Sequence, residues 1–194
     1  MAELKDSGAR RDFGTGAVRD AAEGKGRCDL LPLSILLNLK GGVGADLVLE
    51  KINAYLCFSN TACLEDAIQS FMTIRGWDYC TMLLEVSKQF EDGAKKYGDN
   101  NWRSGIPLHC YIDSALRHYI KWCRGDTDEP HDRAVCWNLL CAIWTHTFEP
   151  EMIDFTVGKV GYILRDTDGS LARILEEESP PAVNLSPFNP VGKT

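Results

Sequence analysis

After Pro32, apolar residues recur every three or four positions, and this period restricts the possible folds more than any other feature of the sequence. Such a period places apolar side chains on one face of a helix, whereas a half-buried strand alternates apolar and polar residues. No convincing alternation of that kind occurs along the chain. We therefore predict an all-α helical bundle, with helices over 45–58, 61–75, 78–97, 111–124 and 131–147.

The chain of 194 residues suits a single domain, whose helical core we expect over 28–157. The segment 131–147 is apolar almost all round, so it is predicted to lie at the centre of the bundle. Residues 158–194 are expected to form an irregular tail, because the stretch from 179 is rich in proline.

Residues 1–27 are rich in glycine and arginine and cannot supply a core element. One interpretation is a flexible tail. The other is an ordered arm that lies over a ligand and offers backbone N–H groups and guanidinium groups to phosphates. The sequence leaves both open.

The charge balance limits the possible partners of the protein. The chain has 28 acidic and 21 basic residues, which give a formal net charge of −7. Nucleic acid is not expected as the main partner, because phosphate-backbone binding favours a basic surface. The longest apolar run, 30–39, is shorter than the about 20 residues that span a bilayer, so no membrane contact is expected. The eight cysteines form no CxxC pair and no signal peptide precedes them, so we expect reduced thiols in a cytoplasmic protein.

Residues 91–102 combine carboxylates, two lysines, a tyrosine, asparagines and a tryptophan, which an ordinary surface helix does not need. The cations could neutralise phosphoryl oxygens, and Tyr97 or Trp102 could stack on a base. A plainer interpretation remains for part of this set. Glu91 and Lys95 are spaced as a common i,i+4 ion pair on a solvated helix face, and Trp102 could anchor the core.

A second polar group lies in 125–138, where Asp128, His131 and Asn138 share a face if a helix begins near Asp128. Pro130 suits the first turn of such a helix. Carboxylates there are favourable as caps alone, but a buried Asn138 needs hydrogen-bond partners. Carboxylates from two helices would supply the hard oxygen ligands that Mg²⁺ prefers.

Four blocks in order resemble a known family: “GARRDFGTGAVRD…GKGRCDLLP”, “FEDGAKKYGDNNWRSGIP”, “SALRH” and “GDTDEPHDRAVCWNLL”. They are similar to a largely bacteriophage family of dATP/dGTP diphosphohydrolases over residues 8–32 and 90–144. The resemblance implies a MazG-type all-α enzyme that hydrolyses purine deoxynucleoside triphosphates to the monophosphate and pyrophosphate. It also implies Mg²⁺, with Mn²⁺ as a substitute, a homo-oligomer, and the host cytoplasm as the location.

Taken with these patterns, the resemblance gives a candidate site. The candidate catalytic residues are Glu91, Glu129 and His131. The candidate metal ligands are Glu91, Asp128, Glu129 and Asp132. The candidate substrate-binding residues are Arg19, Lys25, Arg27, Lys95, Lys96, Tyr97, Asn101, Trp102, Arg117, His118 and Asn138.

The chain departs from the family pattern in two ways. A helical segment is inserted at about 40–77, and the Glu-x-x-Glu pair typical of MazG-type enzymes has no clear counterpart. Two alternatives therefore stay open. One is an HD-type phosphohydrolase built from His118, His131-Asp132 and Asp154, which would use a transition metal and release triphosphate. The other is a non-catalytic phage protein that binds and sequesters a nucleotide.

Overall fold

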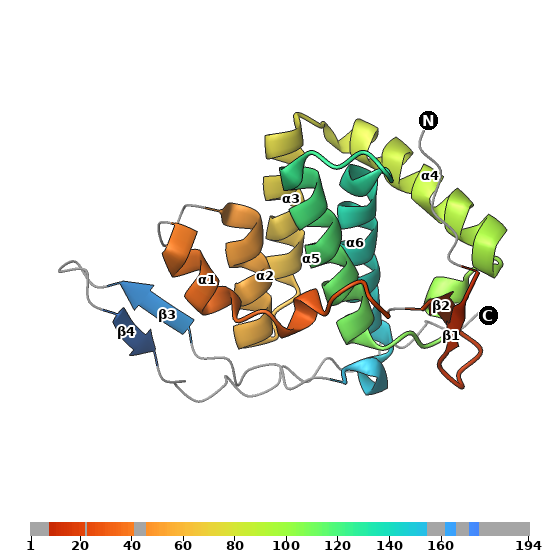
Figure 1. The fold of residues 1–194 in the computed structure, drawn as a ribbon, viewed down its shortest axis with the longest axis horizontal. Helices are drawn as coiled ribbons and strands as arrows, with labels where there is room; N and C mark the ends of the chain where they lie inside the picture. The colour runs from red at the N-terminus through yellow and green to blue at the C-terminus, as the bar shows by residue number, and fades with distance from the viewer. Residues whose placement is uncertain (1–7, 22, 41–45, 155–161, 166–170, 175–194) are drawn as a thin grey trace, which may run out of the picture.

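A computed structural model of the chain describes residues 8–21, 23–40, 46–154, 162–165 and 171–174. The described part is mostly helical, which confirms the all-α prediction (Figure 1). Its α-helices are α1 (Leu33–Lys40), α2 (Leu47–Phe58), α3 (Ala62–Arg75), α4 (Tyr79–Tyr97), α5 (Leu108–Arg124) and α6 (His131–Phe148). Short 3-10 turns are η1 (Cys28–Leu30), η2 (Asn101–Arg103) and η3 (Pro150–Met152).

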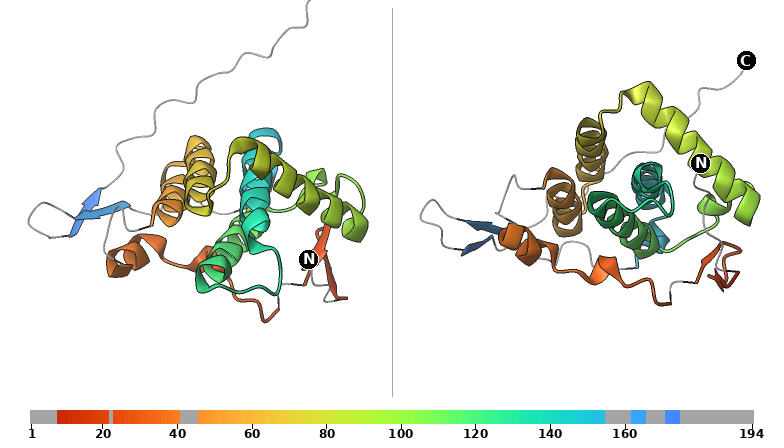
Figure 2. Two further views of the ribbon diagram at one scale, coloured as in Figure 1. Left: turned by 90° about the horizontal axis from the view of Figure 1, so that it is seen from above. Right: turned by 45° about the horizontal axis from the view of Figure 1, so that its top comes forward.

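Helices α5 and α6 pack against each other at the centre, and α6 also contacts α3 and α4. The central position predicted for 131–147 is therefore correct. Helix α2 packs on α3, and α1 on α2, so these helices extend the bundle on one side. Helix α4 runs obliquely to its neighbours and diverges from α6 toward its C-terminal end (Figure 2).

The helices begin and end where side chains and glycine satisfy their backbone groups. Asp46 caps α2 by accepting from Leu49 N at 3.2 Å, and Asp78 caps α4 by accepting from Thr81 N at 2.6 Å. Helix α5 ends at Gly125, whose φ of 83° lies in the left-handed region that glycine adopts without strain. The packed helices enclose one apolar core, with Tyr55, Tyr111 and Phe71 among its largest fully buried side chains.

Four short strands accompany the helices, although the sequence shows no convincing alternation. Strands β1 (Arg10–Asp12) and β2 (Val18–Asp20) form an antiparallel hairpin, so residues 8–21 make an ordered arm. Strands β3 (Tyr162–Arg165) and β4 (Leu171–Ile174) form a second hairpin within the tail expected to be irregular. Three- and four-residue strands are too short to show an alternating pattern. The proline-rich stretch from 179 lies outside the described residues.

All eight cysteines are free thiols, as expected. Among the helices that the structure describes, none combines the length and apolarity needed to cross a membrane.

Candidate functional site

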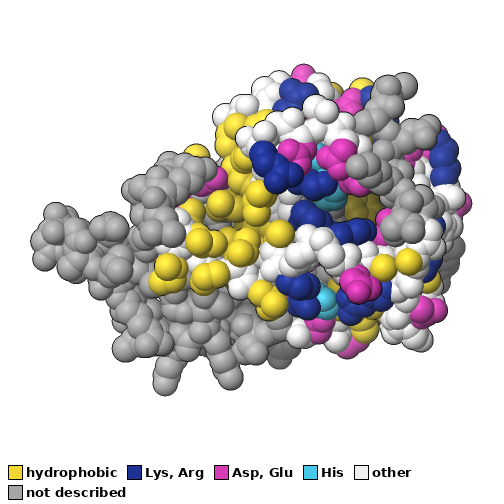
Figure 3. Space-filling model, viewed as in Figure 1, with side chains coloured by type: hydrophobic (Ala, Val, Ile, Leu, Met, Phe, Trp, Pro, Cys, Tyr) yellow, Lys and Arg dark blue, Asp and Glu magenta, His cyan; other side chains and the backbone are white. Residues whose placement is uncertain are grey.

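A cavity of about 1280 Å³ lies between the arm, α4, α5 and the start of α6. Among the described residues that line it, eight are Lys or Arg and six are Asp or Glu, although the whole chain has a net charge of −7. Figure 3 shows Lys and Arg side chains gathered around this hollow. A cavity with excess positive charge in an acidic protein favours an anionic ligand.

The arm forms one wall of the cavity and is fixed to the helices by side chains. Asn101 Oδ1 accepts from Val18 N at 2.8 Å, and Asn101 Nδ2 donates to Val18 O at 2.9 Å. Asp20 then accepts from Lys96 Nζ at 2.6 Å and lies 3.9 Å from Lys25 Nζ. Asn101, predicted to contact a nucleoside, therefore uses its amide to hold strand β2.

Arg19, on β2, points toward the central helices. Its Nη2 donates to Ser114 Oγ and to Asn138 Oδ1, both at 3.1 Å, and its guanidinium lies 5.0 Å from the Tyr111 ring centroid. Its Nη1 is buried and has no hydrogen-bond partner among the described residues. Asn138 also donates to Ala134 O at 2.8 Å, so its buried amide orients Arg19.

Further cations lie beside the arm. Arg117 donates to Asp113 Oδ2 at 2.5 Å and to Ser114 Oγ at 2.9 Å, which fixes its guanidinium. Burial lowers the pKa of Lys25, the carboxylate of Asp20 opposes that shift, and the charge of Arg117 adds to it. The positive charges of Lys25 and Arg117 therefore repel each other, and an anion bound between them would reduce this repulsion.

Of the other predicted substrate-binding residues, Tyr97 lies among charged neighbours. Arg10 and Lys96 approach its ring, at 5.2 and 5.3 Å from the centroid. Burial, followed by the nearby Asp20 carboxylate, raises the Tyr97 pKa, so its hydroxyl stays protonated. Arg27 forms an ion pair with Asp29 at the cavity edge.

An aromatic group forms another part of the wall. Phe90 lies 5.3 Å from Trp102 and 5.8 Å from Trp137, measured between ring centroids. The buried Trp137 Nε1 and the buried Gln89 Oε1 each lack a hydrogen-bond partner among the described residues. Sequence reasoning missed both residues. The signal for Gln89 was a polar side chain that continues the buried face of α4 after Met82 and Val86.

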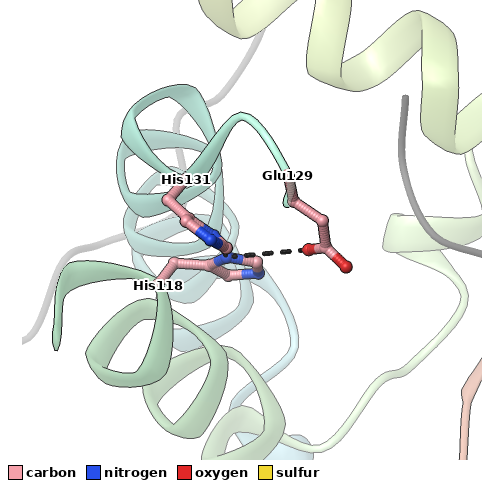
Figure 4. Close-up of side chains that lie close together, drawn as sticks. All are labelled: His118, Glu129 and His131. Carbon is pink, nitrogen blue, oxygen red and sulfur yellow. Dashed lines mark hydrogen bonds and ion pairs between the residues drawn. The ribbon is translucent and has the colours of Figure 1, made fainter. Parts of the chain in front are cut away.

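Two imidazoles and a carboxylate meet at the junction of α5 and α6 (Figure 4). His118 Nδ1 lies 2.9 Å from His131 Nδ1 and 3.9 Å from Glu129 Oε2. His131 Nε2 lies 2.9 Å from Asp128 Oδ1. Burial, reinforced by the charge of Arg117, lowers the pKa of His118 to about 3, so this imidazole is neutral at physiological pH.

The start of the helix predicted over 131–147 is correct, whereas the earlier start near Asp128, on which a face shared with Asp128 depended, does not occur. Helix α6 begins at His131, with Pro130 as its N-cap at φ −76° and ψ 75°. A proline disfavours the helical conformation of the residue before it, so Glu129 precedes the helix. Asp128 and Glu129 therefore lie in a turn facing α5, where Asp128 also pairs with Lys121 Nζ at 3.0 Å.

The four carboxylates predicted to hold Mg²⁺ are not gathered in one place. Glu91 pairs with Lys95 Nζ at 2.5 Å on an exposed face of α4. Asp132 pairs with Arg75 Nε at 3.0 Å. Two sets of groups converge, His118 with Glu129 and His131, and Asp126 with Asp128 and His131. Each includes at least one imidazole, so neither fits the all-oxygen shell typical of Mg²⁺.

The arrangement needed by an HD-type enzyme is not assembled either. Asp132 is engaged by Arg75, and Asp154 accepts from His109 N at 3.1 Å and pairs with the His109 ring. Neither aspartate joins the His118–His131 pair.

A comparison with family models found a match for the part of the chain that builds most of the cavity. Residues 72–154 match the model described as dATP/dGTP diphosphohydrolase, N-terminal. Over this segment the chain is similar to the dATP/dGTP diphosphohydrolase family. The segment contains α4, η2, α5 and α6, and with their connections it supplies the cavity walls except those formed by the arm and by residues 24–27. The match includes the blocks recognised at 90–144, whereas the block at 8–32 lies outside it. Searches of curated proteins and of solved structures found no match.

Proposed function

We propose that the protein hydrolyses purine deoxynucleoside triphosphates, bound as their Mg²⁺ complexes, to the monophosphate and pyrophosphate. The observation that carries this proposal is the basic cavity built mainly by the diphosphohydrolase segment, with cations and aromatic side chains in its wall. A nucleotide needs both kinds of contact, because its phosphates are anionic and its base is flat and apolar on its faces.

The triphosphate is assigned to Lys25, Lys96 and Arg117. Arg117 suits this role because Asp113 and Ser114 fix its guanidinium before the ligand arrives. Fixed donors stabilise charge that develops on phosphoryl oxygens without reorganising during the reaction. Lys96 would share its ammonium between Asp20 and the ligand.

The purine is assigned to the aromatic group of Phe90, Trp102 and Trp137. The unpartnered Trp137 Nε1 can donate to a ring nitrogen or carbonyl oxygen of the base. The unpartnered Gln89 Oε1 can accept from an amino group of adenine or guanine. A buried polar atom gains most from such a bond, because it is costly to leave unpaired.

Glu129 is assigned as the general base. One of its oxygens faces His118, and Figure 4 shows the other directed away from the imidazole pair. That oxygen would take a proton from a water molecule that attacks the α-phosphorus. The new P–O bond forms as the bond to the β-phosphate oxygen breaks, and pyrophosphate leaves.

The test is incubation of the purified protein with each dNTP and NTP plus Mg²⁺, and in parallel with Mn²⁺, with products resolved by ion-exchange chromatography. Monophosphate and pyrophosphate from a purine dNTP are expected. Glu129→Gln should abolish turnover. Asp132→Asn is the matched control, since Asp132 pairs with Arg75, and it should retain turnover. Release of intact triphosphate would contradict the proposal.

A second candidate is a nucleotide binder that sequesters its ligand without cleaving it. The observation in its favour is the dispersal of Glu91 and Asp132, which leaves no cluster of carboxylates for a Mg²⁺-activated water. Tight binding of a nucleotide that is recovered intact after denaturation would establish this function in place of hydrolysis.

Two further parts of the proposal concern where the protein acts and how many copies of it assemble. We propose action on the nucleotide pool of a phage-infected cytoplasm, and a homo-oligomeric state. Light scattering after size-exclusion chromatography at micromolar concentration tests the second part, and a stable monomer would contradict it.

A further inference from the structure

The starting point is the orientation of the two imidazoles, which face each other through their Nδ1 atoms at 2.9 Å. Asp128 Oδ1 lies 2.9 Å from His131 Nε2, so this carboxylate fixes the ring proton of a neutral His131 on Nε2. His131 Nδ1 then carries a lone pair directed at His118.

A carboxylate that orients a histidine through its second nitrogen is the arrangement found behind many metal-binding histidines. The third donor, Glu129 Oε2, lies 3.9 Å from His118 Nδ1. All three ligand atoms lie within 4.8 Å of one another. Donors bound at about 2.1 Å to one cation are separated by roughly 3–4 Å, so a single ion fits this set with small adjustments.

We propose that His118, His131 and Glu129 bind one divalent transition-metal ion of the Mn²⁺ or Fe²⁺ type, with Asp128 as a positioning residue. Two imidazoles and one carboxylate suit these ions, whereas Mg²⁺ prefers oxygen ligands alone. His118 and Glu129 line the cavity, so the remaining coordination positions open toward it.

A second set, Asp126, Asp128 and His131, also meets the spacing for a cation. It is less suitable, because Asp126 pairs with Arg124, and Asp128 pairs with Lys121 and with His131 Nε2. The site on His118, His131 and Glu129 does not depend on the proposed hydrolysis, because the protein alone supplies its ligands.

The test uses the full chain after treatment with a chelator, without nucleotide. Mn²⁺ is titrated in, and loss of the free-ion signal in electron paramagnetic resonance reports binding. Mn²⁺ is the chosen probe because it binds thiolates weakly and the chain has eight free cysteines. One Mn²⁺ per chain is expected, retained in a hundredfold excess of Mg²⁺.

His118→Gln and Glu129→Gln should each weaken Mn²⁺ binding at least tenfold. Asp128→Asn should weaken it by about 10–100-fold, as changes behind a ligating histidine typically do. His109→Gln is the matched control, because His109 also lines the cavity but pairs with Asp154, and it should bind Mn²⁺ normally. Far-ultraviolet circular dichroism checks that each variant is folded.

No binding of Mn²⁺, displacement by equimolar Mg²⁺, or unchanged affinity in folded His118→Gln would overturn the site. These outcomes are separable from failure of the proposed function. Mn²⁺ bound with the expected variant pattern but without nucleotide turnover would support the site and count against hydrolysis.

Discussion

The side-chain amide of Asn101 pairs with both backbone groups of Val18, as a neighbouring strand would, at 2.8 and 2.9 Å. This pair joins strand β2 to the turn after α4 and closes one side of the cavity. It explains how an arm rich in glycine and arginine lies in one place, since its own hairpin has only three residues in each strand.

Replacing Asn101 by Ala should release the arm while the helices stay folded. Two hydrogen bonds worth about 1 kcal/mol each are lost, and the loss is local because the arm contributes little to the core. Hydrogen exchange followed by mass spectrometry should show faster exchange in peptides covering residues 10–20. Asn60→Ala removes a comparable bond to Ala62 N at the start of α3 and should leave the arm unchanged. Equal arm exchange in both variants would contradict this interpretation.

The adjacent lysines of α4 should differ sharply in nucleotide binding. The Lys95 side chain is 67% exposed and pairs with Glu91, whereas Lys96 is 9% exposed and pairs with Asp20 at the cavity. Lys96→Gln should weaken nucleotide binding by at least tenfold, because it removes a partly desolvated charge from the phosphate region. Lys95→Gln should change it by less than about twofold, since exposed i,i+4 pairs contribute little. Isothermal titration of both variants with one nucleotide measures the contrast, and equal effects would refute it.

The helices could be predicted from sequence because each buries one apolar face, and a period of three to four residues records that face directly. The helix boundaries were also predictable where a capping side chain or a glycine marks them, as at Asp78 and Gly125. The predicted start at 131 also matches α6, which begins directly after Pro130. Only the helical face shared by Asp128 with His131 and Asn138, which required a start near Asp128, does not form.

The sequence predicted which residues belong to the candidate site better than it predicted how their side chains are arranged. Most of the substrate-binding candidates line one cavity. The partners were not predictable, because the direction of a side chain on a helix depends on which neighbour covers it. Glu91 and Asp132 were candidate metal ligands from the sequence, yet Lys95 and Arg75 engage them. Gln89 and Trp137 were not predicted as site residues, because a single polar atom on a buried face does not alter the apolar periodicity of a helix.

Asp46 should be one of the more sensitive buried positions. Its Oδ1 accepts from Leu49 N at 3.2 Å as the cap of α2 and from Tyr119 OH at 2.7 Å inside the core. Asp46→Ala removes the cap and the carboxylate that accepts from the buried Tyr119 hydroxyl, so the free energy of unfolding should fall by about 2–4 kcal/mol. Chemical denaturation measures this value. Tyr119→Phe in the same chain should recover part of the loss, because the hydroxyl that lost its Asp46 acceptor is then absent. A double variant as destabilised as the sum of the single ones would show that the two side chains are not coupled.

Acidification should lower the stability of the protein in part through His146, which lies on α6 outside the cavity. Its Nδ1 lies 2.8 Å from Tyr55 OH, and burial lowers its pKa below the ordinary value. The unfolded chain therefore binds a proton on this residue more readily than the folded chain does. Stability from this group is complete well above pH 6.5 and falls as the pH drops below it.

The urea midpoint of the protein should thus decrease from pH 7.5 to pH 5.5, and the decrease should be smaller in His146→Gln. His109 provides a control of opposite sign, because its hydrogen bond with Cys110 and its pairing with Asp154 raise its pKa. A raised pKa stabilises the folded state at low pH, so His109→Gln should make the decrease larger. A smaller decrease in His109→Gln, or an unchanged one in His146→Gln, would show that these environments do not control the two protonation equilibria.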